Sequence, residues 1–203
     1  MQKKDLIQSL KKKGFSKEIL NAFEKVNREN FISKGLRERA YEDTALSIGE
    51  DQTISQPYTI AMMLELLNLK KNQKVLEVGS GSGYVLALIS QITKSKVYGI
   101  ERIKELAEKS KHSLKEYLNI EVYTKNGAEG LKEYAPYNRI LISAACKQVP
   151  KSLLSQLKNN GILVAPVDSR FTGQSLVAIQ RKKDKFVIKK KIPGFIFVRF
   201  IED

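Results

Sequence analysis

Apolar residues recur near the start of the chain at the three- and four-residue spacing of amphipathic helices. The first predicted helix covers 5–13 and ends near Gly14, with an apolar face made by Leu6, Ile7 and Leu10. The second follows Ser16, its predicted cap, with an apolar face made by Ile19, Leu20, Phe23 and Val26. Residues 27–56 lack a steady period, so we expect a long loop there.

From residue 57 onward, helical periods alternate with short apolar runs. Pro57 suits the first turn of a helix that continues to about residue 68. The following strands are predicted over 75–78, 97–100, 120–123, 140–142 and 162–165. The helices between them are predicted over 84–93, 102–117 and 151–158. This alternation predicts a parallel sheet covered on both faces.

The end of the chain breaks this alternation. Three apolar segments follow one another with no helical period between them, over 176–180, 186–190 and 195–200. Successive strands joined by turns predict an antiparallel edge on the otherwise parallel sheet. The expected architecture is therefore a doubly wound, mostly parallel α/β sheet with an antiparallel edge and a helical N-terminal region.

Length and composition agree with one domain. The chain has 203 residues, of which 42% are hydrophobic, enough for one core without a disulfide or metal. We expect a single domain over 1–203, with a helical lid over 1–56 and a core over 57–203. The single cysteine, Cys146, and the single histidine, His112, exclude a disulfide framework and leave too few ligands for a zinc site.

The sequence carries no membrane signal. No apolar run reaches the roughly 18 residues that a membrane helix needs. The first fifteen residues have charges between their apolar positions, unlike a signal peptide. We therefore expect a reduced, cytoplasmic protein without a membrane partner, and we expect a monomer.

The net charge of +14 is concentrated at the two ends of the chain. Residues 1–40 hold 11 basic and 5 acidic side chains, and residues 181–203 hold 8 and 3. The segment between them, with 17 basic and 14 acidic side chains, carries only +3. A nucleic-acid footprint is one interpretation of this excess, and a solvated lysine-rich surface is the favoured one.

A glycine-rich loop joins the first strand of the core to its helix. Gly79, Gly81 and Gly83 are spaced G-x-G-x-G, unlike the G-x-G-x-x-G of dinucleotide folds. Glu77 precedes them at the strand end, where a carboxylate would repel a pyrophosphate but accept hydrogen bonds from an ammonium. This combination favours S-adenosylmethionine, which carries an ammonium and a sulfonium.

The next strand also ends in an acid. Glu101 lies 18 residues after Gly83 and can accept hydrogen bonds from both hydroxyls of a ribose. The loop and the two acids predict a cofactor site of the methyltransferase type, but they do not indicate the substrate.

A polar stretch precedes the helix that begins at Pro57. It contains Gln52, Thr53, Ile54 and Ser55. The hydroxyls of Thr53 and Ser55 and the amides of the helix start could bind a carboxylate. Ser55 could instead serve only as the cap of that helix.

This stretch carries a resemblance to a known family. The runs Tyr41–Gly49 and Gln52–Pro57 resemble the signature of the protein-L-isoaspartate (D-aspartate) O-methyltransferases. The similarity continues in order over 75–84, 135–138, 154–158, Gly161, Pro166 and 197–198. The resemblance implies a seven-stranded S-adenosylmethionine-dependent methyltransferase fold. It also implies methyl transfer to the α-carboxyl of isoaspartyl residues in damaged proteins and peptides, with S-adenosyl-L-homocysteine as the second product.

The resemblance also implies residue roles. Ser55 matches the active-site serine, to which we assign a positioning role. The expected cofactor-binding residues are Glu77, Gly79, Ser80, Gly81, Gly83, Glu101, Asn126 and Gly127. The expected substrate-binding residues are Gln52, Thr53, Ile54, Ser55 and Val198.

Several positions depart from the family pattern. Asn126 replaces an aspartate that lies against the adenine, Arg199 replaces a proline, and Asp51 stands where glycine is common. Two alternatives therefore stay open. One is a nucleic-acid methyltransferase on the same fold, for which the chain offers no Trp and no base-holding tetrapeptide. The other is an inactive relative that binds isoaspartyl peptides.

Overall fold

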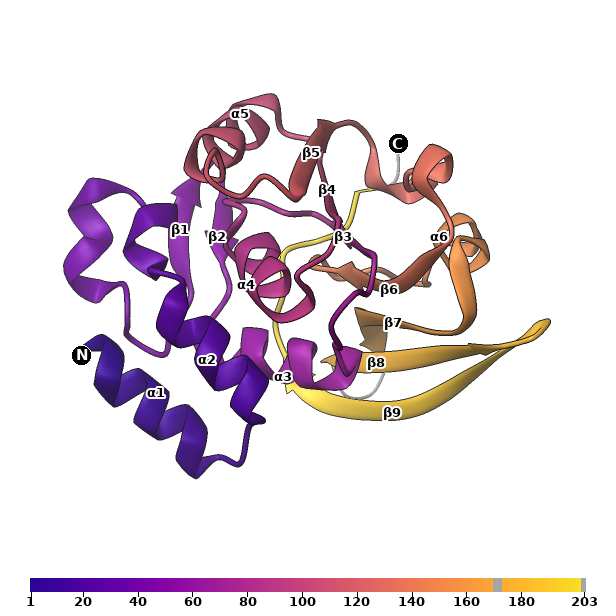
Figure 1. Ribbon diagram of the computed structural model, residues 1–203, viewed down its shortest axis with the longest axis horizontal. Helices are drawn as coiled ribbons and strands as arrows, with labels where there is room; N and C mark the ends of the chain where they lie inside the picture. Colours follow the sequence, from indigo (N-terminus) through magenta and orange to yellow (C-terminus); the bar gives the residue numbers. More distant parts are fainter. Residues whose placement is uncertain (170–172, 202–203) are drawn as a thin grey trace.

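The computed structural model describes residues 1–169 and 173–201. Its centre is a seven-stranded sheet with the order β5-β4-β3-β6-β7-β8-β9 (Figure 1). The strands are β3 (Val75–Val78), β4 (Val97–Glu101), β5 (Ile120–Thr124), β6 (Tyr137–Ile142), β7 (Leu157–Ser169), β8 (Gly173–Lys182) and β9 (Lys185–Phe195). Neighbours from β5 to β7 pair in parallel, and β8 and β9 pair antiparallel. The predicted fold class is confirmed.

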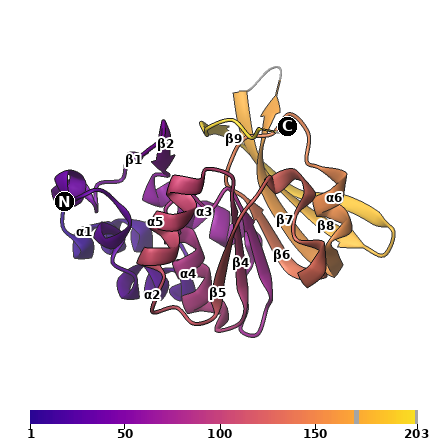
Figure 2. The ribbon, with the colours of Figure 1, turned by 90° about the horizontal axis from the view of Figure 1, so that it is seen from above.

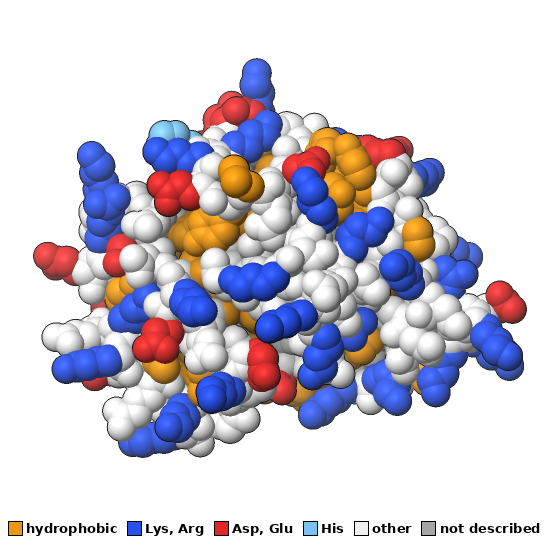
Figure 3. Space-filling model, viewed as in Figure 1, with side chains coloured by type: hydrophobic (Ala, Val, Ile, Leu, Met, Phe, Trp, Pro, Cys, Tyr) orange, Lys and Arg blue, Asp and Glu red, His pale blue; other side chains and the backbone are white. Residues whose placement is uncertain are grey.

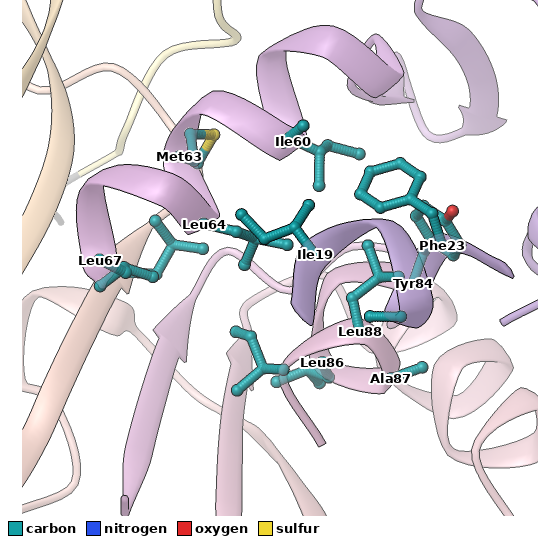
Figure 4. Packing of buried hydrophobic residues seen from close by; sticks show 14 of the residues in the cluster. Ile19, Phe23, Ile60, Met63, Leu64, Leu67, Tyr84, Leu86, Ala87 and Leu88 are labelled. Carbon is teal, nitrogen blue, oxygen red and sulfur yellow. The ribbon is translucent and has the colours of Figure 1, made fainter. Parts of the chain in front are cut away.

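Both faces of the sheet are covered. The helices after residue 56 are α3 (Pro57–Leu67), α4 (Tyr84–Thr93), α5 (Lys104–Ser113) and α6 (Lys151–Ser155). Consecutive residues of a strand point to opposite faces, and Val75 and Leu76 accordingly belong to separate apolar clusters. The first cluster contains residues of α3 and α4, which Figure 4 shows packed together with Ile19 and Phe23, and the second contains Leu153 of α6.

The N-terminal helices α1 (Lys3–Lys12) and α2 (Lys17–Lys25) form at the predicted positions. Their apolar faces join the first cluster, where Phe23 packs edge-on against Tyr84. Figure 2 shows these helices beside α3 to α5 rather than beside α6. Ser16 occupies the N-cap position of α2, but its side chain makes no capping hydrogen bond.

The prediction of a long loop over 27–56 is wrong. The segment contains two 3₁₀ helices, Arg28–Phe31 and Lys34–Arg39, and an antiparallel hairpin of β1 (Leu46–Gly49) and β2 (Gln52–Ile54). Strands this short carry too few alternating positions to give a period. The turn holds Asp51 at φ 54°, a left-handed conformation that explains why glycine is common there.

The prediction of a last strand over 195–200 is also wrong. β9 ends at Phe195, and the chain beyond makes an isolated bridge between Arg199 and Ala145. There the Ala145 N–H donates to Val198 O and the Phe200 N–H donates to Ala145 O, both at 2.8 Å. The chain thus crosses the carboxyl end of β6 instead of extending the sheet.

Two predicted helices are shorter than expected. The helix predicted over 102–117 is α5, Lys104–Ser113, and the helix predicted over 151–158 ends at Ser155, since β7 begins at Leu157. Among the described residues, no helix has the length and apolar character to cross a membrane.

Candidate functional site

A pocket lies at the carboxyl ends of β3, β4 and β6, between the glycine loop and the β1–β2 hairpin. This is where ligands bind in open α/β sheets. Eleven predicted site residues line it: Gln52, Thr53, Ile54, Ser55, Glu77, Gly79, Ser80, Gly81, Glu101, Gly127 and Val198. The structure thus brings most of the predicted cofactor and substrate residues to one cavity.

The glycine loop curves away from β3 in a left-handed conformation. Gly79 has φ 79° and Gly81 has φ 51°, which favour glycine. The N–H groups of Gly79 and Ser80 donate to Ile100 O at 2.8 and 3.0 Å, which fixes the loop to β4. The loop is thereby held against the strand that carries Glu101.

Glu101 fixes the same loop through its side chain. Its Oε2 accepts the Gly81 N–H at 2.8 Å, and its Oε1 accepts the Ile103 N–H at 2.9 Å. The residue is buried yet lines the pocket. Each carboxylate oxygen retains a second lone pair, so the side chain can also accept from a diol.

Glu77 is a buried acid with one unsatisfied oxygen. Its Oε1 accepts the Ser143 hydroxyl at 2.7 Å, whereas Oε2 has no hydrogen-bond partner within the described chain. Burial raises the pKa of Glu77 to about 8. Ser80 Oγ, which also lines the pocket, is buried without a partner in the same part of the molecule. Two such orphaned polar atoms fit a ligand that carries polar hydrogens, as S-adenosylmethionine does.

Gly83 and Asn126 do not line the pocket. Gly83 begins α4 at φ 86°, and a Cβ there would lie 2.7 Å from Leu114 Cδ1, so close helix packing explains this glycine. Asn126 Oδ1 accepts the Ala128 N–H at 2.8 Å and caps the 3₁₀ helix Gly127–Glu129. Asn126 therefore adjoins the pocket only through Gly127.

Ser55 is a half-buried residue of the pocket wall between β2 and α3. The N-cap of α3 is Gln56, so the capping interpretation of Ser55 is wrong. The Tyr58 N–H at the start of α3 donates to Asp43 Oδ1 at 2.8 Å, and Pro57 has no N–H. The chain's own carboxylate thus occupies a donor that we had expected to serve a substrate carboxylate.

Neither Cys146 nor His112 lines this pocket. Cys146 is buried beside Pro166, and His112 is exposed in the last turn of α5. No group of three or more His, Cys, Asp or Glu side chains among the described residues could hold a metal ion.

Sequence reasoning missed part of the pocket wall. Ser143 directly follows β6, and the rule that ligands bind at the carboxyl ends of strands could have found it. Tyr84 and Arg199 also line the pocket. No local pattern indicated either of them, because they reach it through tertiary packing.

Comparison with known proteins identifies the family of the chain. The profile of the protein-L-isoaspartate(D-aspartate) O-methyltransferase family matches residues 1–203. The chain belongs to this family. It is 44% identical to the protein-L-isoaspartate O-methyltransferase of Ignicoccus hospitalis, over 99% of this chain and 98% of that one. It is 42% identical to that of Christiangramia forsetii, over 99% and 94%.

Solved structures of protein-L-isoaspartate O-methyltransferases share the fold. One, 28% identical, superposes with a TM-score of 0.90 over 98% of this chain and 65% of that one. A Plasmodium falciparum structure described as a β-aspartate methyltransferase in complex with S-adenosyl-L-homocysteine is also 28% identical, with a TM-score of 0.86 over 98% of both chains.

This protein-L-isoaspartate O-methyltransferase is therefore an S-adenosylmethionine-dependent repair enzyme. Family membership favours that function over the nucleic-acid and inactive alternatives. Figure 3 shows Lys and Arg side chains spread over the visible face rather than gathered in one patch, as a solvated surface would present them.

Proposed function

We propose that the pocket holds the cofactor along the glycine loop and the α-carboxylate of an isoaspartyl residue beside Ser55. The observation that carries this assignment is the common cavity. Ser55 and the hairpin form one wall of it, while Glu77, the glycine loop and Glu101 form another. A methyl donor and its acceptor must share one such cavity for direct transfer.

For the cofactor, each polar group of the wall has a role. Glu77 Oε2 accepts from the amino-acid ammonium, Glu101 accepts from the ribose hydroxyls, and Gly127 with Asn126 adjoins the adenine. The backbone of the loop at Gly79, Ser80 and Gly81 lies along the amino-acid portion. When bound, the cofactor supplies a methyl group on a sulfonium, which is a good leaving group.

For the substrate, the hairpin supplies neutral donors. Ser55 orients the carboxylate with its hydroxyl, aided by Gln52 and Thr53, while Ile54 and Val198 form apolar walls. A carboxylic acid with a pKa near 4 is already ionised at neutral pH, so no side chain needs to remove a proton. Neutral donors hold the carboxylate without cancelling its charge, which preserves its nucleophilicity.

We further propose that the chain acts as one monomeric domain in the cytoplasm, with residues 1–56 as a lid. The apolar cluster shared by α1 and α2 with α3 and α4 supports the single domain. The partners that this function requires are damaged proteins and peptides with isoaspartyl residues.

The deciding experiment is a methyl-transfer assay with an isoaspartyl peptide and its aspartyl counterpart. We expect transfer only to the isoaspartyl peptide. Ser55→Ala should lower kcat/KM about 10- to 100-fold, the loss of one hydrogen bond to a charged group, with unchanged S-adenosylhomocysteine affinity. Ser155→Ala, in α6 and outside the pocket wall, is the matched control. Equal transfer to both peptides would contradict the proposal.

A further inference from the structure

Arg28 is a fully buried arginine at the start of the 3₁₀ helix Arg28–Phe31. Its Nη1 donates to Ser55 O at 2.9 Å, and its Nη2 donates to Thr44 O at 3.3 Å. Its Nε is buried without a hydrogen-bond partner in the described residues. Buried arginines are normally paired with a carboxylate. Among the residues that the structure describes, Arg28 forms no salt bridge with a carboxylate.

This charge lies directly behind the substrate wall. Arg28 does not line the pocket, whereas Ser55 and Tyr84 do. The guanidinium carbon is 5.4 Å from the centre of the Tyr84 ring. Burial lowers the pKa of Arg28 to about 10, although attraction to Tyr84 and to the Asp43 carboxylate opposes that shift, so the side chain stays protonated at neutral pH. Two residues of the pocket wall therefore separate a permanent positive charge from the cavity.

The hydrogen bond from Arg28 to Ser55 O sets the orientation of the peptide unit that follows Ser55. In a trans peptide, the C=O and the following N–H point to opposite sides. Because the Ser55 carbonyl is bound to Arg28, the N–H of Gln56 points away from the guanidinium. The cation thus fixes and polarises the peptide unit that follows Ser55. In a buried environment its field is screened less than that of a surface lysine.

We propose that Arg28 is a positioning residue for the substrate: it fixes the Ser55 and Thr44 carbonyls and attracts the α-carboxylate without touching it. The inference rests on the proposed role of Ser55. A direct Arg–carboxylate pair would occupy the oxygen lone pairs that attack the methyl group. A cation behind a backbone wall attracts the same carboxylate while leaving those lone pairs available.

The test compares the effects of Arg28 variants on peptide binding and on cofactor binding. In Arg28→Met, we expect KM for a neutral isoaspartyl peptide to rise at least about tenfold. The dissociation constant of S-adenosylhomocysteine should change less than about threefold, because the cofactor wall is intact. Arg28→Lys keeps the charge and Arg28→Gln keeps only a neutral donor, so the KM of the Lys variant should lie closer to wild type.

Arg139 offers a matched control. It is also buried, and its guanidinium donates to backbone carbonyls, including Asn68 O at 3.0 Å. It lies outside the pocket wall. Arg139→Met and Arg28→Met should both lower the unfolding temperature, but Arg139→Met should leave the peptide KM unchanged. All assays are run where thermal unfolding shows that each variant is folded.

The outcomes separate the two roles. A selective rise in peptide KM, partly restored by lysine, supports the proposal. Equal KM changes in the Arg28 and Arg139 variants would show a merely structural role, as would parallel losses of peptide and cofactor affinity. If Arg28→Met does not fold, the Lys and Gln variants decide, and equal KM values for the two overturn the role of charge. Failure of the wild type to methylate the isoaspartyl peptide would instead overturn the proposed function.

Discussion

The carboxylate of Glu101 accepts the backbone N–H of Gly81 at 2.8 Å, so the end of β4 fixes the loop that follows β3. The same side chain accepts the Ile103 N–H through its other oxygen. Its position is therefore set before any ligand arrives. This preorganisation lowers the cost of ordering the loop when the cofactor binds.

Glu101→Gln should weaken both the loop and the cofactor site. A glutamine can accept at only one of its two terminal atoms, so one of these two N–H groups loses its acceptor and faces an NH₂ group. We expect the free energy of unfolding to fall by about 1–3 kcal/mol and S-adenosylhomocysteine affinity to fall at least about tenfold. Urea unfolding and calorimetry measure the two effects, and wild-type affinity in the variant would contradict the role of Glu101.

Glu77 should make the stability of the ligand-free protein fall with rising pH. Burial raises the pKa of this carboxyl from 4.5 to about 8. Between these values the unfolded chain releases the proton and the folded protein keeps it, so deprotonation favours unfolding. We expect the Tm to fall more steeply between pH 5 and about pH 8 in wild type than in Glu77→Gln.

Binding of the cofactor should reverse this protonation. An ammonium at Oε2 favours the ionised carboxylate, so binding at pH 7 should release a proton from Glu77. Calorimetry in buffers of different ionisation enthalpy measures that release. Glu77→Gln provides the control, and an identical proton release in the variant would exclude Glu77 as its source.

Asn126→Asp should tighten cofactor binding several-fold. Asn126 Oδ1 already caps the following 3₁₀ helix, so Nδ2 is the atom of this side chain that remains for an adenine bound beside Gly127. Aspartate can keep that cap and offer its second oxygen to the exocyclic amino group of adenine, as a charged acceptor. S-adenosylhomocysteine titrations compare the variants. Asn126→Ala, which removes the cap, separates this gain from a general change in stability.

Salt should slow the reaction with acidic peptides. A second groove is lined by Lys147, Lys151 and Arg199, and Asp168 is the acidic residue among its described lining. Arg199 also lines the pocket that contains Ser55. Positive charge beside a site accelerates encounters with anions at low ionic strength. From about 20 to 150 mM salt, we expect kcat/KM to fall more for a glutamate-containing isoaspartyl peptide than for its glutamine counterpart. Arg199→Ala should reduce that difference, and equal salt dependence would make these charges irrelevant to substrate capture.

The elements that sequence predicted well are those with a strong local period. The fully buried run of β3 and the helices α3 and α4 appear where their spacing placed them. Prediction failed where pairing replaced periodicity. The β1–β2 hairpin is too short for a pattern, and the segment after Phe195 meets Ala145 instead of extending β9.

The residues of the candidate site also fall into those that the sequence could place and those that it could not. The acids at the ends of β3 and β4, and the glycines that follow β3, could be placed from the sequence, since the carboxyl ends of neighbouring parallel strands share one edge. The sequence could not show that Glu77 binds Ser143, 66 residues away. Nor could it show that Asp43 occupies the start of α3, because capping by a distant side chain leaves no local pattern.

The sequence by itself determined the fold class, the cofactor loop and the family, because these depend on periodicity and on short motifs that stay local along the chain. Only the tertiary structure decided which groups surround Ser55. Arg28 lies behind it, 27 residues earlier in the chain, and Val198 lines the same pocket. Such contacts arise when separate segments pack to bury apolar surface and satisfy polar groups. Local residue patterns do not specify which distant groups will meet.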